Sequence, residues 1–230
     1  MTGLAPAPFG VELLDDPEAD PATVARSLRN IARANRWFGG ESAALWGIGR
    51  LLASHPRLLG ISLLDIGTGA ADLPVAARRR LARGGRTLRP LALERSRVAA
   101  GLAAARGIPT VVACAGRIPV RPGGVDIVLI SQVAHHLAPA AVVELFRTAS
   151  ALARIGVVVA DLRRSEVAVA AFRFGSLVLG FDPVTRRDGV TSVRRGYSAD
   201  ELWALAARAG QAAEVSRRPG FRLVACWRTA

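Results

Sequence analysis

Residues 63–74 hold the side chains best suited to bind a ligand. An apolar run ends in an aspartate, a glycine-containing turn follows, and a helix start comes after it. A strand that ends in this way brings backbone N–H groups and a helix N-terminus close to a ligand, because glycine has no Cβ to keep the ligand away. The positions of this loop that we expect to contact the ligand are Asp65, Gly67, Thr68, Gly69 and Asp72.

The spacing within this loop separates the main classes of glycine-rich binding site. A dinucleotide fingerprint requires a glycine or alanine at the sixth position and an acidic residue about twenty positions further on. Here the sixth position is Asp72, and the acidic residue after the second predicted strand is Glu94, 27 residues after Gly67. The G-K-[ST] of a phosphate-binding P-loop is also missing from the sequence of this loop. Neither class therefore fits.

Asp65 instead favours a ligand that carries positive charge. Its carboxylate would repel a pyrophosphate, whereas S-adenosylmethionine (SAM) has both a sulfonium and an ammonium group. Glu94 lies at the end of the second predicted strand, where an ionised carboxylate can accept hydrogen bonds from two ribose hydroxyls. We therefore predict that the loop binds SAM.

Two histidines and an aspartate follow predicted strands that should be neighbours in one sheet. His135 and His136 come after the strand 125–130, and Asp161 comes directly after the strand 155–160. Ligands of open parallel sheets bind beyond the carboxyl ends of the strands, so these side chains should meet at one edge. We expect His135 to take the proton of a hydroxyl nucleophile during methyl transfer, Asp161 to orient its imidazole, and His136 to pack or to bind substrate. The alternative is structural: the histidines pack at the start of the next helix, and Asp161 caps a helix.

Beyond residue 60 the sequence alternates between short apolar strands and helices of about ten residues, which is typical of a parallel sheet covered on both faces. Two further strands, 213–217 and 222–227, are separated by Pro219 and Gly220 and should form an antiparallel hairpin. We predict an α/β fold with a doubly wound, mostly parallel, seven-stranded, Rossmann-like sheet whose last strand is antiparallel. The five earlier strands are expected at 61–66, 88–93, 110–113, 125–130 and 155–160, and the helices between them at 73–83, 97–106 and 139–152.

Two segments are expected to cover this sheet domain, which we assign to residues 58–230. The first is an N-terminal leader and helical cap, residues 1–57, and the second is a substrate-cap insertion at about 162–197. Apolar spacings of three and four residues and proline positions define their helices. The expected parts are an irregular leader at 1–19, helices at 21–35 and 42–54, an apolar helix at 162–180, a polar loop at 181–195 and a helix at 198–209.

The sequence resembles the class I SAM-dependent methyltransferases in four blocks, 63–74, 91–96, 113–128 and 129–137. Within that family it is most similar to small-molecule methyltransferases of the ubiquinone and menaquinone type. Residues 182–195 resemble the tail of bacterial methyltransferases associated with type III polyketide synthases and phenolic lipids. The resemblance implies SAM as cofactor and S-adenosylhomocysteine (SAH) as product. It adds four cofactor-binding positions, Arg95, Cys114, Ala115 and Ser131.

Two positions depart from the pattern of that family. Ala71 stands where a third glycine is usual, and Cys114 stands where an aspartate commonly binds the adenine amine. Cysteine is a weak hydrogen-bond partner. The adenine would therefore be held by the backbone N–H of Ala115 and by apolar packing that includes Ile118.

The apolar character of the insertion indicates a hydrophobic substrate. Its side chains either line a tunnel for an aromatic ring with an alkyl tail or pack on the sheet as core. We expect methyl transfer to a hydroxyl of a phenolic lipid, polyketide or quinone precursor, with C-methylation of a quinone ring and a non-catalytic binding protein as alternatives. Trp37 and Phe38 form either a lid over the cleft or a hydrophobic staple between two helices. The candidate substrate contacts are Trp37, Phe38, Phe172, Asp188, Arg194 and Tyr197.

The length and net charge of the chain indicate how many domains it forms and what kind of partner it binds. The chain has 230 residues, of which 51% are hydrophobic, and it can bury the core of one large domain. A net charge of +13 ordinarily points to a polyanion partner. However, all 31 basic residues are arginines and they are scattered, and no N-P-P-Y-like segment follows the strand 125–130. We therefore expect no nucleic-acid partner.

Cysteine use and hydropathy indicate the cellular setting. Cys114 and Cys226 are far apart and form no C-x-x-C, so we expect neither a disulfide framework nor a metal site, and a reducing, cytoplasmic setting. The N-terminus lacks the features of a signal peptide. The apolar run 167–181 is interrupted by Arg173 and is too short to span a bilayer. We expect no transmembrane segment. Peripheral contact with a membrane is compatible with this expectation.

Overall fold

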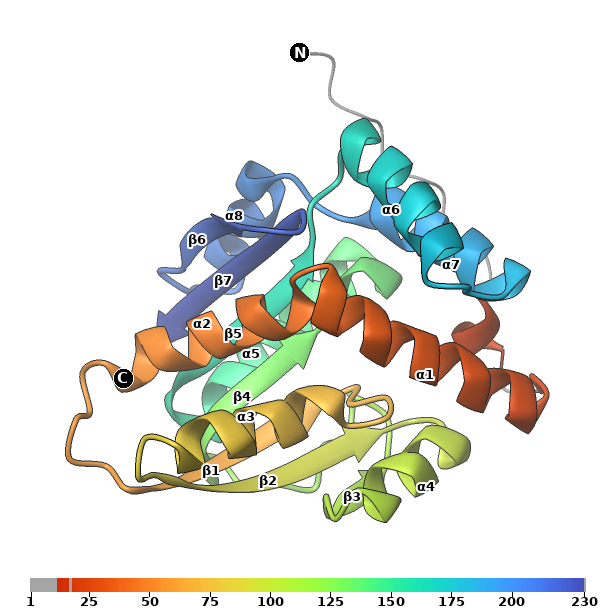
Figure 1. Cartoon of the computed structure of the whole chain (residues 1–230). Coiled ribbons are helices and arrows are strands. Elements are labelled where there is room, and N and C mark those ends of the chain that lie inside the picture. Colours follow the sequence, from red (N-terminus) through yellow and green to blue (C-terminus); the bar gives the residue numbers. More distant parts are fainter. Residues whose placement is uncertain (1–11, 17, 230) are drawn as a thin grey trace.

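The computed structural model describes residues 12–16 and 18–229, and it contains a seven-stranded sheet in the order β3-β2-β1-β4-β5-β7-β6 (Figure 1). The first five strands run parallel to one another, and β7 is antiparallel to both of its neighbours. The strand order reverses between β1 and β4, as in other doubly wound sheets. The predicted fold is therefore confirmed. The strands are β1 (Gly60–Ile66), β2 (Thr87–Glu94), β3 (Thr110–Val112), β4 (Val125–Ser131), β5 (Ala153–Leu162), β6 (Glu214–Arg218) and β7 (Arg222–Arg228).

Helices cover both faces of the sheet and its carboxyl edge. They are α1 (Pro21–Trp37), α2 (Gly40–Leu52), α3 (Asp72–Ala82), α4 (Arg97–Ala105), α5 (Pro139–Leu152), α6 (Glu166–Val178), α7 (Pro183–Arg195) and α8 (Ala199–Arg208), with short 3-10 turns η1 (Leu13–Asp15) and η2 (Ala134–His136). α2, α3 and α4 lie on one face, and α5 and α8 lie on the other. α1, α6 and α7 gather beyond the carboxyl ends of the strands (Figure 1).

The two faces of the sheet bury separate cores, because consecutive residues of a strand point to opposite sides. Leu63 and Ile127 pack with α2 and α3 on one face. Leu64 and Val128, one residue further along each strand, pack with α5 and α8 on the other. All seven residues of β4 are buried, as expected for a parallel strand covered on both faces. The sheet is therefore a rigid base for the loops at its carboxyl edge.

One segment differs from its prediction: residues 181–195 include the helix α7 where a polar loop was expected. Asp182 caps the first turn with its side chain, and Pro183 occupies the first helical position. Val193 then packs against Val169 of α6. This helix is hard to predict from the sequence because it contains a glycine and several valines and threonines, whose helix propensity is modest or low.

Two other boundaries also shift. β5 continues to Leu162, so the apolar helix begins at Glu166 and not at residue 162.

Residues 1–11, most of the expected leader, lie outside the described part of the chain. No helix within the described residues combines the length and apolar character needed to cross a membrane.

Candidate functional site

A cavity of about 870 Å³ lies at the carboxyl ends of β1, β2 and β4, where α1 and α7 cover it. This is where open parallel sheets bind their ligands. The cavity brings together most of the residues singled out in the sequence, although these come from distant parts of the chain. Those that line it are Asp65, Gly67, Thr68, Gly69, Asp72, Glu94, Arg95, Cys114, Ala115, Ser131, His135, His136, Phe172 and Asp188.

The loop after β1 has a left-handed backbone at three positions. Gly67 has a φ of 71°, and a Cβ there would lie 2.5 Å from Cγ2 of Val133, so a larger residue would require Val133 to move. Gly69 has a φ of 56° and Ala71 a φ of 57°, which is uncommon for a residue with a Cβ. The loop thus has a glycine-type conformation at residue 71 even though alanine replaces the usual glycine.

Asp65 lies at the base of this loop with one satisfied and one unsatisfied oxygen. The side chain is 2% exposed, and the Thr68 hydroxyl donates to its Oδ2 at 2.6 Å. Its Oδ1 has no hydrogen-bond partner among the described residues. Burial is the main cause that raises the pKa of Asp65 to about 7, and the nearby carboxylates of Asp72 and Glu94 also raise it. The hydrogen bond from Thr68 acts in the opposite direction and lowers the pKa. A cation placed at Oδ1 would satisfy this oxygen and favour its ionised form.

Glu94 connects the end of β2 to the glycine loop. Its Oε2 accepts from the Gly69 N–H at 2.9 Å, and its Oε1 accepts from the Ser96 N–H at 2.9 Å. Each carboxylate oxygen can accept a second hydrogen bond, so Glu94 keeps acceptor capacity toward the cavity that it lines. Arg95 is held at the same edge by donating to the Leu14 carbonyl at 3.2 Å.

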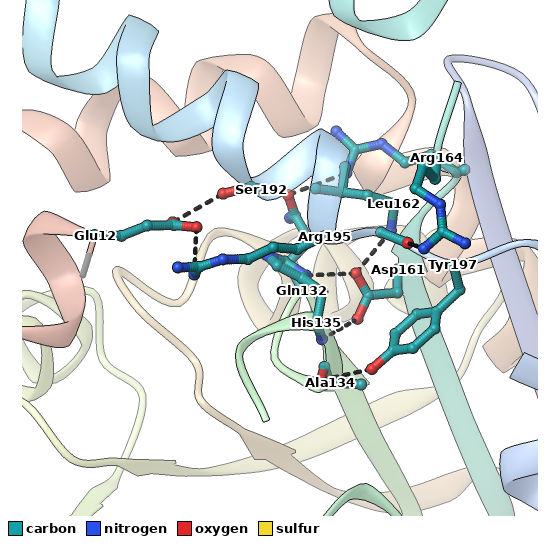
Figure 2. A network of polar contacts seen from close by, with 12 residues as sticks. Glu12, Gln132, Ala134, His135, Asp161, Leu162, Arg164, Ser192, Arg195 and Tyr197 are labelled. Carbon is teal, nitrogen blue, oxygen red and sulfur yellow. Dashed lines mark hydrogen bonds and ion pairs between the residues drawn. The ribbon is translucent and has the colours of Figure 1, made fainter. Parts of the chain in front are cut away.

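His135 and Asp161 form a buried pair at the ends of β4 and β5 (Figure 2). The His135 Nδ1 lies 2.6 Å from Oδ1 of Asp161, and both residues are almost fully buried. Burial alone would raise the pKa of Asp161, but the charge and hydrogen bond of His135, together with the Leu162 N–H at 2.7 Å, hold it below its ordinary value. Asp161 is therefore ionised and can only accept a hydrogen bond.

The state of Asp161 determines the tautomer of His135. Because an ionised carboxylate only accepts, the proton lies on Nδ1, and Nε2 of a neutral ring carries the lone pair. This Nε2 is buried without a hydrogen-bond partner among the described residues, and His135 lines the cavity. In its neutral form the His135 ring therefore holds a proton acceptor within the wall of the cavity.

A second charge pair lies next to the histidines. The Arg195 guanidinium donates to Oε1 of Glu12 at 2.7 Å, and the Ser192 hydroxyl donates to Oε2 at 2.8 Å (Figure 2). The ligand atoms of Glu12, His135 and His136 lie within 4.8 Å of one another, close enough for a shared metal ion. However, Arg195 already neutralises the Glu12 carboxylate, which lowers its attraction for a cation.

The six predicted substrate residues are distributed unevenly. Phe172 and Asp188 line the cavity, and Phe38 packs on Phe172 with ring centroids 5.9 Å apart. Tyr197 donates to the Ala134 carbonyl at 2.8 Å and lines a smaller cavity of about 330 Å³ that His135 also borders. The described lining of the main cavity does not include four of the six residues. These are Trp37, Phe38, Arg194 and Tyr197.

A chain of buried and half-buried polar residues in the wall of the cavity connects to Asp72 and was not anticipated from the sequence. Arg222 donates to Gln132 at 3.0 Å, Gln132 donates to Asn35 at 2.6 Å, and Asn35 donates to Asp72 at 2.9 Å. Burial lowers the pKa of Arg222 to about 10, while Asp161 and Asp72 oppose this change, so it remains charged at neutral pH. Arg222, Gln132 and Asn35 belong to no local motif, because each meets the next across a large sequence separation.

The comparison with solved structures finds proteins of similar fold, whereas the two comparisons by sequence find no match. The chain matches no protein-family model and no curated protein sequence. Many solved structures match its fold. The structure of the plantazolicin methyltransferase BpumL in complex with SAH has a TM-score of 0.68 at 12% identity, covering 95% of this chain and 94% of that chain.

Two other solved structures are similar over nearly their whole length. A SAM-dependent methyltransferase from Aquifex aeolicus has a TM-score of 0.63 at 14% identity, covering 92% of this chain and 99% of the other. The magnesium protoporphyrin IX methyltransferase ChlM from Synechocystis PCC 6803, with bound SAM, has a TM-score of 0.60 at 12% identity, covering 97% and 100%. The chain therefore shares the fold of class I SAM-dependent methyltransferases.

Proposed function

We propose that this protein binds SAM in the main cavity and methylates a hydroxyl group of a hydrophobic aromatic small molecule. One observation carries the proposal. Asp65 and His135 both line this cavity, and each holds a buried polar atom, Oδ1 of Asp65 and Nε2 of His135, that has no hydrogen-bond partner among the described residues. The fold comparisons support it, because the similar structures include methyltransferases with SAM or SAH bound.

The groups around the glycine loop fit SAM. Asp65 and Asp72 line the cavity as buried or half-buried carboxylates and would attract the positively charged methionine end. Glu94 would accept from the ribose hydroxyls, and the Ala115 N–H beside Cys114 would meet the adenine. Bound there, SAM supplies an electrophilic methyl group.

His135 would act as the general base. As the substrate oxygen gains the methyl group, its proton passes to Nε2 of His135, and the ionised Asp161 stabilises the resulting imidazolium. The 2.6 Å bond between Nδ1 and Asp161 holds the ring in one orientation, so the lone pair is positioned before the substrate arrives.

The covering helices suit an apolar acceptor. Side chains from α1, α6 and α7, and from the loop before α7, line the same cavity as His135, and most of them are apolar or aromatic. A cavity of this kind fits a ring with an alkyl substituent, such as a phenolic lipid, a polyketide or a quinone precursor. The apolar residues of this wall include Val24, Leu28, Ile31, Phe172, Phe181 and Val193.

Product analysis tests this proposal. The purified protein is incubated with SAM that carries a deuterated methyl group and with a panel of alkylresorcinols and quinols. We expect mass spectrometry to find one labelled methyl group on an oxygen atom of the acceptor. A label on a ring carbon would assign C-methylation, and the absence of labelled product from the whole panel would contradict the substrate class.

The Glu12–Arg195 pair leads to a separate prediction about metal ions. Because Arg195 neutralises the carboxylate that would complete a metal site with His135 and His136, methyl transfer should need no divalent cation. Turnover measured after dialysis against EDTA should equal that of the untreated protein. Loss of turnover that returns on addition of zinc or magnesium would assign a metal to this cluster.

A further inference from the structure

The outer side of α6 carries a stripe of large apolar side chains that no element of the described part of the chain covers. Val167, Phe174, Leu177 and Val178 are between 58% and 70% exposed. Their spacing follows the helical repeat, and the exposed alanines 170 and 171 lie between them, so they form one continuous side of the helix. The opposite side packs toward α7. Figure 1 shows α6 at the outside of the molecule, with α7 packed beside it.

Trp37 is a further exposed apolar side chain in the region of α6. It is 67% exposed at the end of α1. Its neighbours in the chain hold it beside α6, because Arg33 donates to the Leu179 carbonyl at 2.6 Å and the Phe38 ring lies directly against Gly175. An exposed tryptophan in the same region as exposed apolar side chains is typical of the boundary between water and lipid. We call Trp37 and the four exposed large side chains of α6 the apolar ridge.

The helices around the apolar ridge are strongly basic. Apart from Arg195, which is buried and paired with Glu12, α1, α6 and α7 hold eight arginines and two acidic residues, a net charge of +6. Arg36 and Arg173, directly next to Trp37 and Phe174 in the chain, are exposed. An apolar face flanked by exposed arginines favours adsorption to a membrane surface, where anionic headgroups lie over an apolar interior.

We propose that the apolar ridge docks this protein on the surface of a lipid bilayer that contains anionic phospholipids. A second copy of the chain is a poorer occupant, since pairing this face with itself would bring two arginine-rich surfaces together. A nucleic acid would engage the arginines but would leave the phenylalanine and aliphatic side chains exposed. Only the bilayer surface matches both the apolar and the charged parts.

Docking through the apolar ridge would also bring the cavity close to acceptors that are dissolved in the membrane. α1, α6 and α7 carry the ridge or its arginines on the outside, and they contribute Ile31, Phe172 and Val193 to the cavity lining on the inside. An acceptor dissolved in the membrane would then reach the cavity without crossing water. This consequence rests on the proposed methyl transfer, whereas the docking itself does not.

Vesicle flotation tests the docking without any methyl donor or acceptor. The full chain is mixed with phosphatidylcholine vesicles, with or without phosphatidylglycerol. We expect the protein to float with the anionic vesicles, less so at high salt, and hardly at all with neutral vesicles. The double variant Phe174→Ser/Val178→Ser should bind the anionic vesicles about tenfold or more weakly. The matched control is Trp203→Ser, which removes an exposed tryptophan from α8 and should bind like the unchanged protein.

Three results would overturn the proposal. These are absence of flotation with anionic vesicles, equal flotation of the double variant, and a dimer in light scattering that the double variant disrupts. Circular dichroism of each variant shows that it is folded. Because Phe174 and Val178 do not contribute to the described cavity lining, SAM binding by the double variant should be unchanged, so a failure of docking is separable from a failure of the proposed function.

Discussion

Replacing Asp65 by asparagine should weaken SAM binding by about a hundredfold or more, since removing one partner of a buried charge pair costs several kcal/mol. Asp65 lines the cavity and its Oδ1 has no partner among the described residues, and the asparagine side chain keeps the size and the bond from Thr68 while losing the charge. Isothermal titration calorimetry with SAM measures the change. Unchanged affinity would exclude Asp65 as the partner of the cation.

The pH dependence of binding provides an internal control. In the ligand-free protein the pKa of Asp65 is raised to about 7 by burial, and a bound cation favours the ionised form. The affinity of the unchanged protein for SAM should therefore rise as pH increases to about 7 and level off above it. The Asp65→Asn variant should lack this dependence, because it has no proton to lose at that position.

The same substitution should stabilise the ligand-free protein. A raised pKa means that the folded state keeps its proton over a range in which the unfolded chain has already lost it, so this carboxyl group destabilises the fold increasingly as pH rises from its ordinary value of 3.8 to about 7. A shift of about three pKa units corresponds to roughly 4 kcal/mol. Chemical denaturation should show Asp65→Asn more stable than the unchanged protein at pH near 8, with little difference near pH 4. A variant less stable than the unchanged protein near pH 8 would contradict the account of a penalised carboxylate.

Replacing His135 by glutamine should lower the turnover number about a hundredfold to ten-thousandfold, which is the usual contribution of a general base. SAM affinity should stay the same, because the base acts on the acceptor. Glutamine retains a polar group near Asp161 but cannot take up a proton. Steady-state kinetics with the best acceptor from the phenolic panel, together with calorimetry, separates the two effects.

Two matched histidine variants check this assignment. His136→Gln should cause a smaller loss of turnover, because His136 lines the cavity but lacks the bond to Asp161. His55→Gln should cause none, because His55 lies at the end of α2 and contacts the Leu51 carbonyl. Full turnover by His135→Gln would remove His135 from the role of base, whatever the other two variants show.

The sheet was predictable because its strands are short apolar runs, each followed by a turn signal that is local in the sequence. β4 is buried along its whole length, and the Pro219-Gly220 turn forms the closing hairpin. The glycine loop and Asp65 were equally predictable, because their signals are also local in the sequence. α7 was not, because its stability comes from an aspartate cap and from contacts with α6 in place of a regular apolar period.

The parts of the site that sequence patterns missed depend on contacts between distant residues. Arg222 reaches Asn35 through Gln132, and Glu12 pairs with Arg195 from the other end of the chain. No spacing within the sequence brings such residues together, so only the folded structure reveals them. The Trp37-Phe38 pair illustrates the opposite case, because one local motif separates into an exposed side chain on the apolar ridge and a ring that packs on Phe172.

Calorimetric titration of the unchanged protein with SAM and SAH tests the central claim most directly. The carboxylates of Asp65, Asp72 and Glu94 around the glycine loop predict that one molecule of either ligand binds per chain, and that each displaces the other. The Asp65→Asn variant serves as the weakened reference in the same titration. Folded protein that binds neither ligand would contradict the assignment of this cavity to SAM.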